Sequence, residues 1–495
     1  MKTLARVTAV VLTLVLLVGI VPVSAAPLDA TVTYYLKDEA DSIKVIGRAE
    51  VTAEGLVPHT TASGFAFYSD CSGDIKVTIS GSSKLFDAQY FIVYVDGEIH
   101  TRIAFVHGKN RSIKTETFTA ASGLTAGMHR IEIYRETEEI NASCVINSIT
   151  LNGTLIPVPN APMMIEFVGD SITTGFGAYP VTAESEAYLK SYPYGDHPIR
   201  QAGTKSYAFL TAAALGMDFQ ACCTSGYGVE IGYNVNPDEN LQLMYPYTAY
   251  HHDSSDEAMW SFERPADIVV INLGTNDIGA GPNKGVRQAQ ILEGVENMMK
   301  LAREKNPNAK IVWVTGMMGD VYKKYIENIV KDLGGAENGY YFCKLPKGMS
   351  GGGGHPDESE HIAASETLVA FLRENVLPAD YATSFKTEAD VRALMQHAKL
   401  TESDRAIAEL EIAIAKKNGG DDAMLTATYD SLQAKINAAS APMPKLEEDE
   451  KSSAWLVVVV VAAAVVVAAA VAVLIVVVVA SKRKKTPTDE TEAPS

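Results

Sequence analysis

The chain contains 495 residues, of which 47% are hydrophobic and 21% are charged, as is typical of globular proteins. This length exceeds one ordinary hydrophobic core, so two or three domains are expected. The net charge of −18 argues against a nucleic-acid partner and disfavours a polyanionic substrate, because phosphate binding needs a basic surface.

The first segment, residues 1–26, predicts a signal peptide. Lys2 and Arg6 supply a positive start, an apolar run follows, and residues 23–25 have the small-residue pattern of a cleavage site. We therefore expect the chain to be exported, and this segment is excluded from the predicted fold.

Residues 27–156 predict a β-sandwich domain. Alternating or β-branched runs are separated by clusters of Gly with Asp or Ser, and Asp96-Gly97 between two runs indicates a tight hairpin. Many short strands joined by turns favour two packed sheets. The runs predicted as strands are 31–35, 43–46, 75–79, 90–95, 129–134 and 144–151.

Residues 161–378, after a proline-containing linker over 156–160, predict an α/β domain. Short apolar runs alternate with helical patterns, which favours a parallel sheet covered by helices on both faces. The predicted strands are 164–168, 268–273 and 311–315, and the predicted helices are 207–215, 286–305 and 362–372.

Residues 386–440 predict a helical hairpin. Apolar residues recur at helical spacing over 404–417 and over 424–438, and the glycines of 418–420 indicate a helix stop between them. Two roles stay open for this hairpin, a stalk or a partner-binding module. An acidic, proline-containing linker over 441–453 follows.

Residues 454–480 predict a transmembrane helix. The run is apolar throughout and, at about 1.5 Å per residue, long enough to cross a hydrocarbon core of roughly 30 Å. Four basic residues at 482–485 follow at once, so 481–495 is expected to be a cytoplasmic tail. The body of the protein is then expected outside the cell, anchored in the plasma membrane.

The cysteines allow at most two disulfides and leave one thiol free, because an odd number is present in an expected exported chain. The adjacent Cys222 and Cys223 are interpreted as buried small residues, and no spacing indicates a metal site. The five are Cys71, Cys144, Cys222, Cys223 and Cys343.

Ser171 is the first candidate for chemistry. It lies in Gly-Asp-Ser-Ile just past the predicted strand 164–168, where α/β sheets bind their ligands. A helix starting behind Ser171 would direct backbone N–H groups at a reacting oxygen. By itself the pattern is a weak signal, because a serine that caps a helix after a strand is common.

Three further positions could complete a site around a nucleophilic serine. Asn276, after the predicted strand 268–273, offers an N–H₂ donor that cannot ionise and suits an oxyanion. Gly226 could offer a backbone N–H as a second donor. His355, after a glycine run, could accept the serine proton as general base, whereas His361 is interpreted as structural. Each position alone is typical of an ordinary turn, loop or helix end.

In this order, Ser171, Gly226, Asn276 and His355 resemble the serine, glycine, asparagine and late histidine of SGNH, or GDSL-type, hydrolases. The resemblance implies that Ser171 and His355 are catalytic and that Gly226 and Asn276 form the oxyanion hole. It implies an α/β SGNH-hydrolase domain over 161–378.

The preceding β segment narrows the resemblance to family-two carbohydrate esterases of the acetyl-xylan esterase type. Residues 45–49, 95–97 and 127–130 look like their N-terminal jelly-roll domain, and residues 169–177 look like their nucleophile segment. The resemblance covers about residues 30–378. It implies a cell-surface carbohydrate O-deacetylase that acts on acetylated polysaccharide or oligosaccharide without a cofactor.

One position departs from the pattern of most SGNH enzymes. They have an aspartate three residues before the catalytic histidine, where this chain has Gly352. Some family-two esterases use a Ser–His dyad, with a backbone carbonyl orienting the imidazole. We therefore expect a dyad of Ser171 and His355, and Asp357 is a poor substitute for the missing carboxylate.

Tyr179 and Tyr247 are candidate substrate contacts, because aromatic rings and sugar rings both present flat apolar faces. Ordinary loop packing is the alternative for both tyrosines. Residues 251–253, His-His-Asp, could suggest a metal, but no third ligand is at hand and the implied chemistry needs none. We therefore expect no metal.

Two other functions stay open. A general short-chain ester or lipid hydrolase would differ in acyl-chain preference, and the lack of a long apolar lid slightly favours acetate. A catalytically decayed carbohydrate-binding surface protein would bind sugar without turnover, although Ser171, Asn276 and His355 are all present. Transfer of acetyl groups between sugars, rather than hydrolysis, is also open.

Overall fold

The structure is a computed structural model that describes part of the chain. The predicted signal peptide (1–26), linker (441–453), transmembrane helix (454–480) and tail (481–495) lie outside the described residues, so they stay predictions. Among the helices that are described, none is both long and apolar enough to cross a membrane. The described residues are 31–83, 88–106, 112–139, 142–180, 198–233, 239–248, 259–284, 287–379, 381, 385–418 and 422–440.

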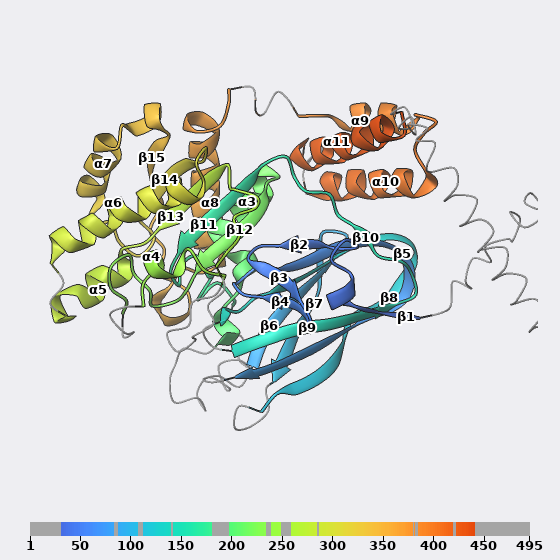
Figure 1. The fold of residues 1–495 in the computed structure, drawn as a ribbon, viewed down its shortest axis with the longest axis horizontal. Helices are drawn as coiled ribbons and strands as arrows, with labels where there is room; N and C mark the ends of the chain where they lie inside the picture. Colours follow the sequence, from blue (N-terminus) through green and yellow to red (C-terminus); the bar gives the residue numbers. More distant parts are fainter. Residues whose placement is uncertain are drawn as a thin grey trace, which may run out of the picture. The chain divides into compact units, whose positions relative to one another are not determined.

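The N-terminal region is rich in strands and contains a ten-stranded sheet (Figure 1). Each predicted strand run overlaps an observed strand, while β3, β4, β7 and β10 lie outside the predicted runs, and β10 is formed by the start of the predicted linker 156–160. The strands are β1 (Val32–Tyr35), β2 (Lys44–Ile46), β3 (Ala49–Thr52), β4 (Gly55–Pro58), β5 (Gly64–Ser83), β6 (Ala88–Val95), β7 (Glu98–Val106), β8 (Lys114–Arg135), β9 (Ala142–Leu151) and β10 (Ile156–Pro157).

Antiparallel pairing along β5 and β8 organises this sheet. The strand order is β3-β4-β9-β5-β8-β6-β7, with β1 paired to β9 and with β2 and β10 paired to β5. The pairing register shifts between Cys71 and Lys76, and such bulges bend long strands. Apolar side chains of these strands bury a core that includes Phe65, Phe91 and Ile131.

The turn between β6 and β7 confirms the predicted hairpin. Val95 pairs with Glu98 across it, and Asp96 and Gly97 have φ angles of 53° and 77°. Two consecutive left-handed residues are what an Asp-Gly hairpin turn requires, since its twist then matches that of the strands.

The second region is an α/β layer structure with a five-stranded parallel sheet, ordered β12-β11-β13-β14-β15. This confirms the parallel sheet that the alternating pattern predicts. The strands are β11 (Met164–Gly169), β12 (Asp218–Cys223), β13 (Ile268–Asn272), β14 (Lys310–Thr315) and β15 (Tyr340–Lys344). The helices are α3 (Tyr207–Leu215), α4 (Leu241–Met244), α5 (Thr275–Lys284), α6 (Gln288–Lys305), α7 (Lys323–Asp332) and α8 (Glu358–Asn375).

Both faces of the parallel sheet are buried under helices (Figure 1). On β11, Ile165 and Phe167 pack against α3 and α8, whereas Val168 joins the core that α4, α6 and α7 cover. Successive side chains of a strand point to opposite faces, so one short apolar run supplies both cores.

A buried ion pair joins the strand-rich region to the parallel sheet. Arg48 Nη2 lies 3.0 Å from Glu166 Oε1, and neither side chain is exposed to solvent. Gln220 and Tyr245 also donate hydrogen bonds to the Glu166 carboxylate. A buried charge of this kind is tolerated only when it is paired and hydrogen-bonded, so this contact ties the two regions together.

Three helices follow the α/β region, namely α9 (Glu388–Met395), α10 (Glu402–Lys417) and α11 (Asp422–Ala438). The helical hairpin is present as α10 and α11, and α9 is an addition to it. The hairpin does not stand apart from the residues before it. Glu411 of α10 is buried and accepts hydrogen bonds from Tyr68 and from Arg130 of β8.

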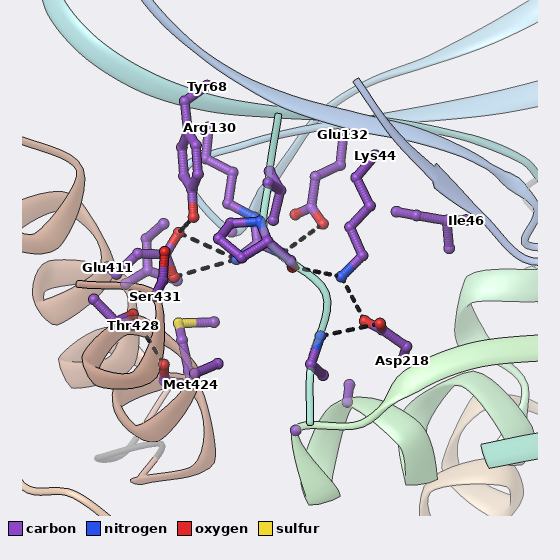
Figure 2. A pocket seen from close by; sticks show the side chains of 18 of the residues that line it. Lys44, Ile46, Tyr68, Arg130, Glu132, Asp218, Glu411, Met424, Thr428 and Ser431 are labelled. Carbon is purple, nitrogen blue, oxygen red and sulfur yellow. Dashed lines mark hydrogen bonds and ion pairs between the residues drawn. The ribbon is translucent and has the colours of Figure 1, made fainter. Parts of the chain in front are cut away.

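A cavity of about 300 Å³ lies between these helices, the strand-rich region and the start of β12 (Figure 2). Its wall carries the ion pairs of Arg130 with Glu411 and of Lys44 with Asp218. Asp218 begins β12, whereas Ser171 lies just past Gly169, the last residue of β11. The cavity is therefore at the amino edge of the parallel sheet, and Ser171 is at the carboxyl edge.

Candidate active site

Ser171 lies in a tight turn directly after β11. The Thr174 N–H donates to the Asp170 carbonyl at 3.1 Å, and the Phe176 N–H donates to the Ser171 carbonyl at 3.0 Å. The prediction of a helix behind Ser171 is wrong, because the chain makes a single turn there and does not continue as a helix. Gly175, with a φ of 73°, takes the left-handed conformation that ends a helix.

The structure brings Ser171 and His355 into direct contact, although 184 positions separate them in the sequence. His355 Nε2 is 2.8 Å from Ser171 Oγ, a normal hydrogen-bond distance. Ser171 is only 8% exposed, and the His355 ring packs against Phe176 with 4.8 Å between ring centroids. This arrangement allows the imidazole to accept the hydroxyl proton.

The loop that carries His355 depends on its glycines. Gly353 and Gly354 have φ angles of 67° and 73°, a region that residues with a β-carbon rarely adopt. His355 Nδ1 lies 3.3 Å from the Gly353 carbonyl oxygen, slightly longer than a typical N–H···O hydrogen bond. Asp357 instead caps α8, where its carboxylate accepts the Glu360 N–H. The group beside Nδ1 is therefore the backbone carbonyl of Gly353, whereas the pattern of most SGNH enzymes has a carboxylate near the catalytic histidine.

Two backbone N–H groups near Ser171 have no acceptor. Neither the Ser171 N–H nor the Gly226 N–H donates a hydrogen bond to any residue that the structure describes. The two turns are adjacent, because Thr174 Oγ1 is 3.5 Å from Ser225 Oγ. Buried N–H groups are nearly always paired, so free ones beside a serine are suited to hold an oxyanion.

Asn276 lies at the start of α5 and connects the same two turns. Its Nδ2 donates to the Tyr227 carbonyl at 2.9 Å and to Asp170 Oδ2 at 3.3 Å. The amide has two N–H donors, so it must release one of these partners to donate to a substrate. The longer hydrogen bond, to Asp170, is the weaker of the two.

Residues 167–336 match the model of the GDSL-like lipase/acylhydrolase family. This part of the chain is a GDSL-like hydrolase domain.

Curated proteins from two bacteria are similar to the chain. The cellulase/esterase CelE of Acetivibrio thermocellus is 27% identical over 277 residues, which are 53% of this chain and 32% of that protein. An acetylxylan esterase/glucomannan deacetylase of Cellvibrio japonicus is 28% identical over 194 residues, which are 37% of this chain and 51% of that protein. The chain therefore spans only part of the length of each of these relatives.

A solved structure shows that the fold is shared. An acetyl xylan esterase from the rumen bacterium Butyrivibrio proteoclasticus superposes with a TM-score of 0.59 at 20% identity. The superposition covers 70% of this chain and 98% of that chain. The GDSL-like domain thus has the hydrolase fold that the sequence resemblance implies.

His361 lies in α8 and has the structural role predicted for it from the sequence. Its side chain is fully buried, and its Nδ1 accepts the Tyr207 N–H at 3.1 Å. Burial lowers the pKa of His361 to about 4, so the ring is neutral at ordinary pH.

The two predicted substrate tyrosines have other neighbours. The Tyr179 ring lies under the Arg102 guanidinium, 3.7 Å from its centre, and Tyr179 is half-buried. The Tyr247 carbonyl accepts a hydrogen bond from Arg48, which also reaches Glu166 in the middle of β11. Their role as substrate contacts stays a prediction.

Tyr233 is an aromatic residue that the sequence did not single out. It is 53% exposed, and its N–H donates to the Gly226 carbonyl at 2.7 Å. An exposed ring joined to the Gly226 turn is well placed to meet a ligand. No local signal distinguishes Tyr233, because its place beside the site depends on how the loop after β12 folds back.

Two carboxylates beside the Ser171 and Gly226 turns were also not predicted from the sequence. Asp170 is fully buried, and burial raises its pKa to about 7. Asp277 accepts three backbone N–H groups, from Val229, Glu230 and Ile231, at 2.8–2.9 Å. Asp170 lies in the motif around Ser171 and Asp277 in the motif around Asn276. The motifs could have drawn attention to both residues, but they do not predict that the carboxylates are buried.

The cysteines are all free thiols and all buried. The sequence allowed up to two disulfides, and none is formed. The His-His-Asp run 251–253 lies outside the described residues. Within the part of the chain that is described, no three His, Cys, Asp or Glu side chains are grouped to hold a metal ion.

Proposed function

We propose that the chain is a cell-surface carbohydrate O-deacetylase that uses Ser171 and His355 as a catalytic dyad. The observation that carries this proposal is the 2.8 Å contact between Ser171 Oγ and His355 Nε2 at the carboxyl edge of the sheet. In an α/β domain this edge is where ligands bind.

The geometry supports a two-step mechanism. Ser171 Oγ attacks the acetyl carbonyl while His355 Nε2 accepts its proton, and the imidazolium then protonates the departing sugar oxygen. Water, activated by His355, attacks the acetyl-enzyme and releases acetate. The Gly353 carbonyl near Nδ1 holds the ring in the tautomer that has a free Nε2 lone pair.

The free N–H groups of Ser171 and Gly226 and the Asn276 amide are the proposed oxyanion donors. Charge develops on the acetyl oxygen in the transition state, and donors fixed in place stabilise it without reorganisation. When Asn276 turns to the substrate it gives up the hydrogen bond to Asp170 and keeps the one to Tyr227.

Acetylated plant-type polysaccharide is the proposed substrate class. One similar protein is named an acetylxylan esterase/glucomannan deacetylase, and an uncharged glycan suits a chain whose net charge is −18. The exposed Tyr233 beside the Gly226 turn offers a flat apolar face for a sugar ring. We further propose that the strand-rich region is a jelly-roll domain of the type found in family-two esterases.

The location at the cell surface is also a proposal. It rests on the positive, apolar start of residues 1–26 and on the apolar run 454–480 followed by basic residues. The hydrolase domain would then act outside the cell, on glycans too large to enter it.

The test is acetate release from acetylated xylan and acetylated glucomannan by the full chain in detergent, beside Ser171→Ala. We expect release by the wild type from at least one glycan and none by the variant. Equal release by both proteins would overturn the assignment of Ser171. Sugar binding without release from any acetyl ester would favour a catalytically decayed binding protein.

A further inference from the structure

Glu138 belongs to the strand-rich region, yet its carboxylate is buried against the GDSL-like domain. It follows the end of β8, and its side chain is 3% exposed. Its Oε2 accepts the Ser225 N–H at 2.6 Å. A carboxylate this close to a backbone N–H forms a charge-assisted hydrogen bond, which is stronger than a neutral one.

This hydrogen bond fixes one side of the Gly226 turn, and Asn276 fixes the other. Ser225 precedes Gly226 and is held by Glu138, whereas Tyr227 follows it and is held through its carbonyl by Asn276. The Gly226 N–H belongs to the peptide unit next to the one that Glu138 binds. Only the two backbone dihedrals of Ser225 separate the bonded N–H from the free one.

The backbone of Glu138 is itself held in place by two hydrogen bonds. Its N–H donates to Gln201 Oε1 at 3.2 Å, and its carbonyl accepts from Arg135 Nη2 at 2.9 Å. Arg135 is fully buried and also donates to the Pro58 carbonyl. Burial raises the pKa of the Glu138 carboxyl, so its position costs stability that a solvent-exposed acid would not.

We propose that Glu138 is a positioning residue for the deacetylation, and that it aims the Gly226 N–H at the oxyanion. The inference rests on the proposed function. It gives the strand-rich region a part in the chemical step, beyond any part in binding glycan. The oxyanion hole of the GDSL-like domain is then complete only when this region is packed against it.

A small acetyl ester such as 4-nitrophenyl acetate distinguishes a role of the strand-rich region in the chemical step from a role in glycan binding. It has no sugar, so a residue that only helps to bind glycan would leave its hydrolysis unchanged. A donor that is turned away from the oxyanion weakens transition-state binding more than substrate binding, so kcat should fall while KM stays nearly constant.

Three substitutions at position 138 in the full chain test the hydrogen bond. Glu138→Ala removes the acceptor and Glu138→Asp withdraws it by one methylene, and each should lower kcat about 10- to 100-fold. Glu138→Gln keeps an acceptor oxygen at the same reach and should stay within about fivefold of the wild type.

Glu136→Gln is the matched control. Glu136 is two residues away and 2% exposed, but its carboxylate accepts from Thr204 and does not touch the Gly226 turn. This variant should stay within about threefold of the wild type, because it perturbs the same contact between regions without moving the donor. Thermal unfolding of every variant shows whether the fold is kept, and Glu138→Asp serves if Glu138→Ala does not fold.

Inhibition by phenylboronic acid gives a second readout, because boronic acids form a tetrahedral adduct with an active-site serine. Its Ki should rise in parallel with the fall in kcat for Glu138→Asp. A folded Glu138→Ala or Glu138→Asp with wild-type kcat and Ki would overturn the inference, as would a Glu138→Gln as impaired as Glu138→Ala. A wild type that hydrolyses no acetyl ester would instead overturn the proposed function itself.

Discussion

Gly177 and His355 lie so close together that a β-carbon added to Gly177 would be 2.8 Å from the β-carbon of His355. It would also be 3.0 Å from the Gly352 carbonyl oxygen and 3.1 Å from that of Pro356. Gly177 has a φ of 85°, which residues with side chains rarely adopt. The turn after the nucleophile thus fixes where the proposed base stands.

Gly177→Ala should therefore separate His355 from Ser171 and lower kcat/KM about 10- to 100-fold, since small misplacements of a catalytic group are costly. The control is Gly123→Ala, because Gly123 also has a positive φ, of 65°, but a β-carbon there would meet no atom within 4 Å. Equal activities of the two variants on 4-nitrophenyl acetate would show that the close approach to His355 does not matter.

Asn276→Ala should lower kcat about 10²- to 10³-fold, the usual effect of losing one oxyanion donor. KM should change little, because the amide acts mainly on charge that develops in the transition state. The variant also loses the hydrogen bond to the Tyr227 carbonyl, so thermal unfolding must be measured beside the kinetics. A fall of less than about threefold would remove Asn276 from the site.

Gly352→Asp restores the carboxylate that most SGNH enzymes have, yet we expect no gain in activity. A β-carbon at position 352 would lie 2.5 Å from Arg200 Cδ, so the new carboxylate is directed toward the Arg200 guanidinium. An ion pair there would leave Nδ1 of His355 facing the Gly353 carbonyl. We expect kcat/KM within about threefold of the wild type or lower, whereas a tenfold rise would mean that the carboxylate reaches the imidazole.

Asp170 should make the free energy of unfolding depend on pH. Burial raises its pKa to about 7, so the folded protein holds this proton over a range in which the unfolded chain has lost it. The stability that protonated Asp170 contributes is present below the unfolded pKa, near 4, and is lost as pH rises through about 7.

Urea denaturation of the wild type and of Asp170→Asn at several pH values between 5 and 8 isolates this group. The difference in free energy of unfolding between the two should change by up to about 1.4 kcal/mol per pH unit, to the disadvantage of the wild type as pH rises. Buried carboxylates far from Asp170 contribute equally to both proteins and cancel, whereas Asp277 and Glu138 interact with the charge of Asp170 and belong to the measured difference. Parallel curves over this range would show that Asp170 is already ionised in the folded state.

The elements that the sequence predicted well are those with a local signal. The run 207–215 coincides with α3, and Asp96-Gly97 forms the expected turn, because hydrophobic spacing and glycine chemistry act within a few residues. Ser171 and His355 came from motif resemblance and lie together in the structure. Motifs after parallel strands meet because the strands end at one edge of the sheet.

The features that the sequence did not predict depend on contacts between distant segments. Glu411 occupies a helix position where a charged side chain normally faces solvent, yet it is buried against Tyr68 and Arg130. Glu138 has no motif around it, and its partner Ser225 is 87 positions away. Such pairings follow from packing, which periodicity within one segment does not contain.

The most direct test of the dyad is mass spectrometry of the enzyme quenched during turnover of 4-nitrophenyl acetate. We expect the mass of one acetyl group on the peptide that contains Ser171, and no such peptide from Ser171→Ala or His355→Ala, both of which should retain the fold. Acetylation of Ser171 at an unchanged rate in His355→Ala, or turnover with the acetyl group on another residue, would contradict the account.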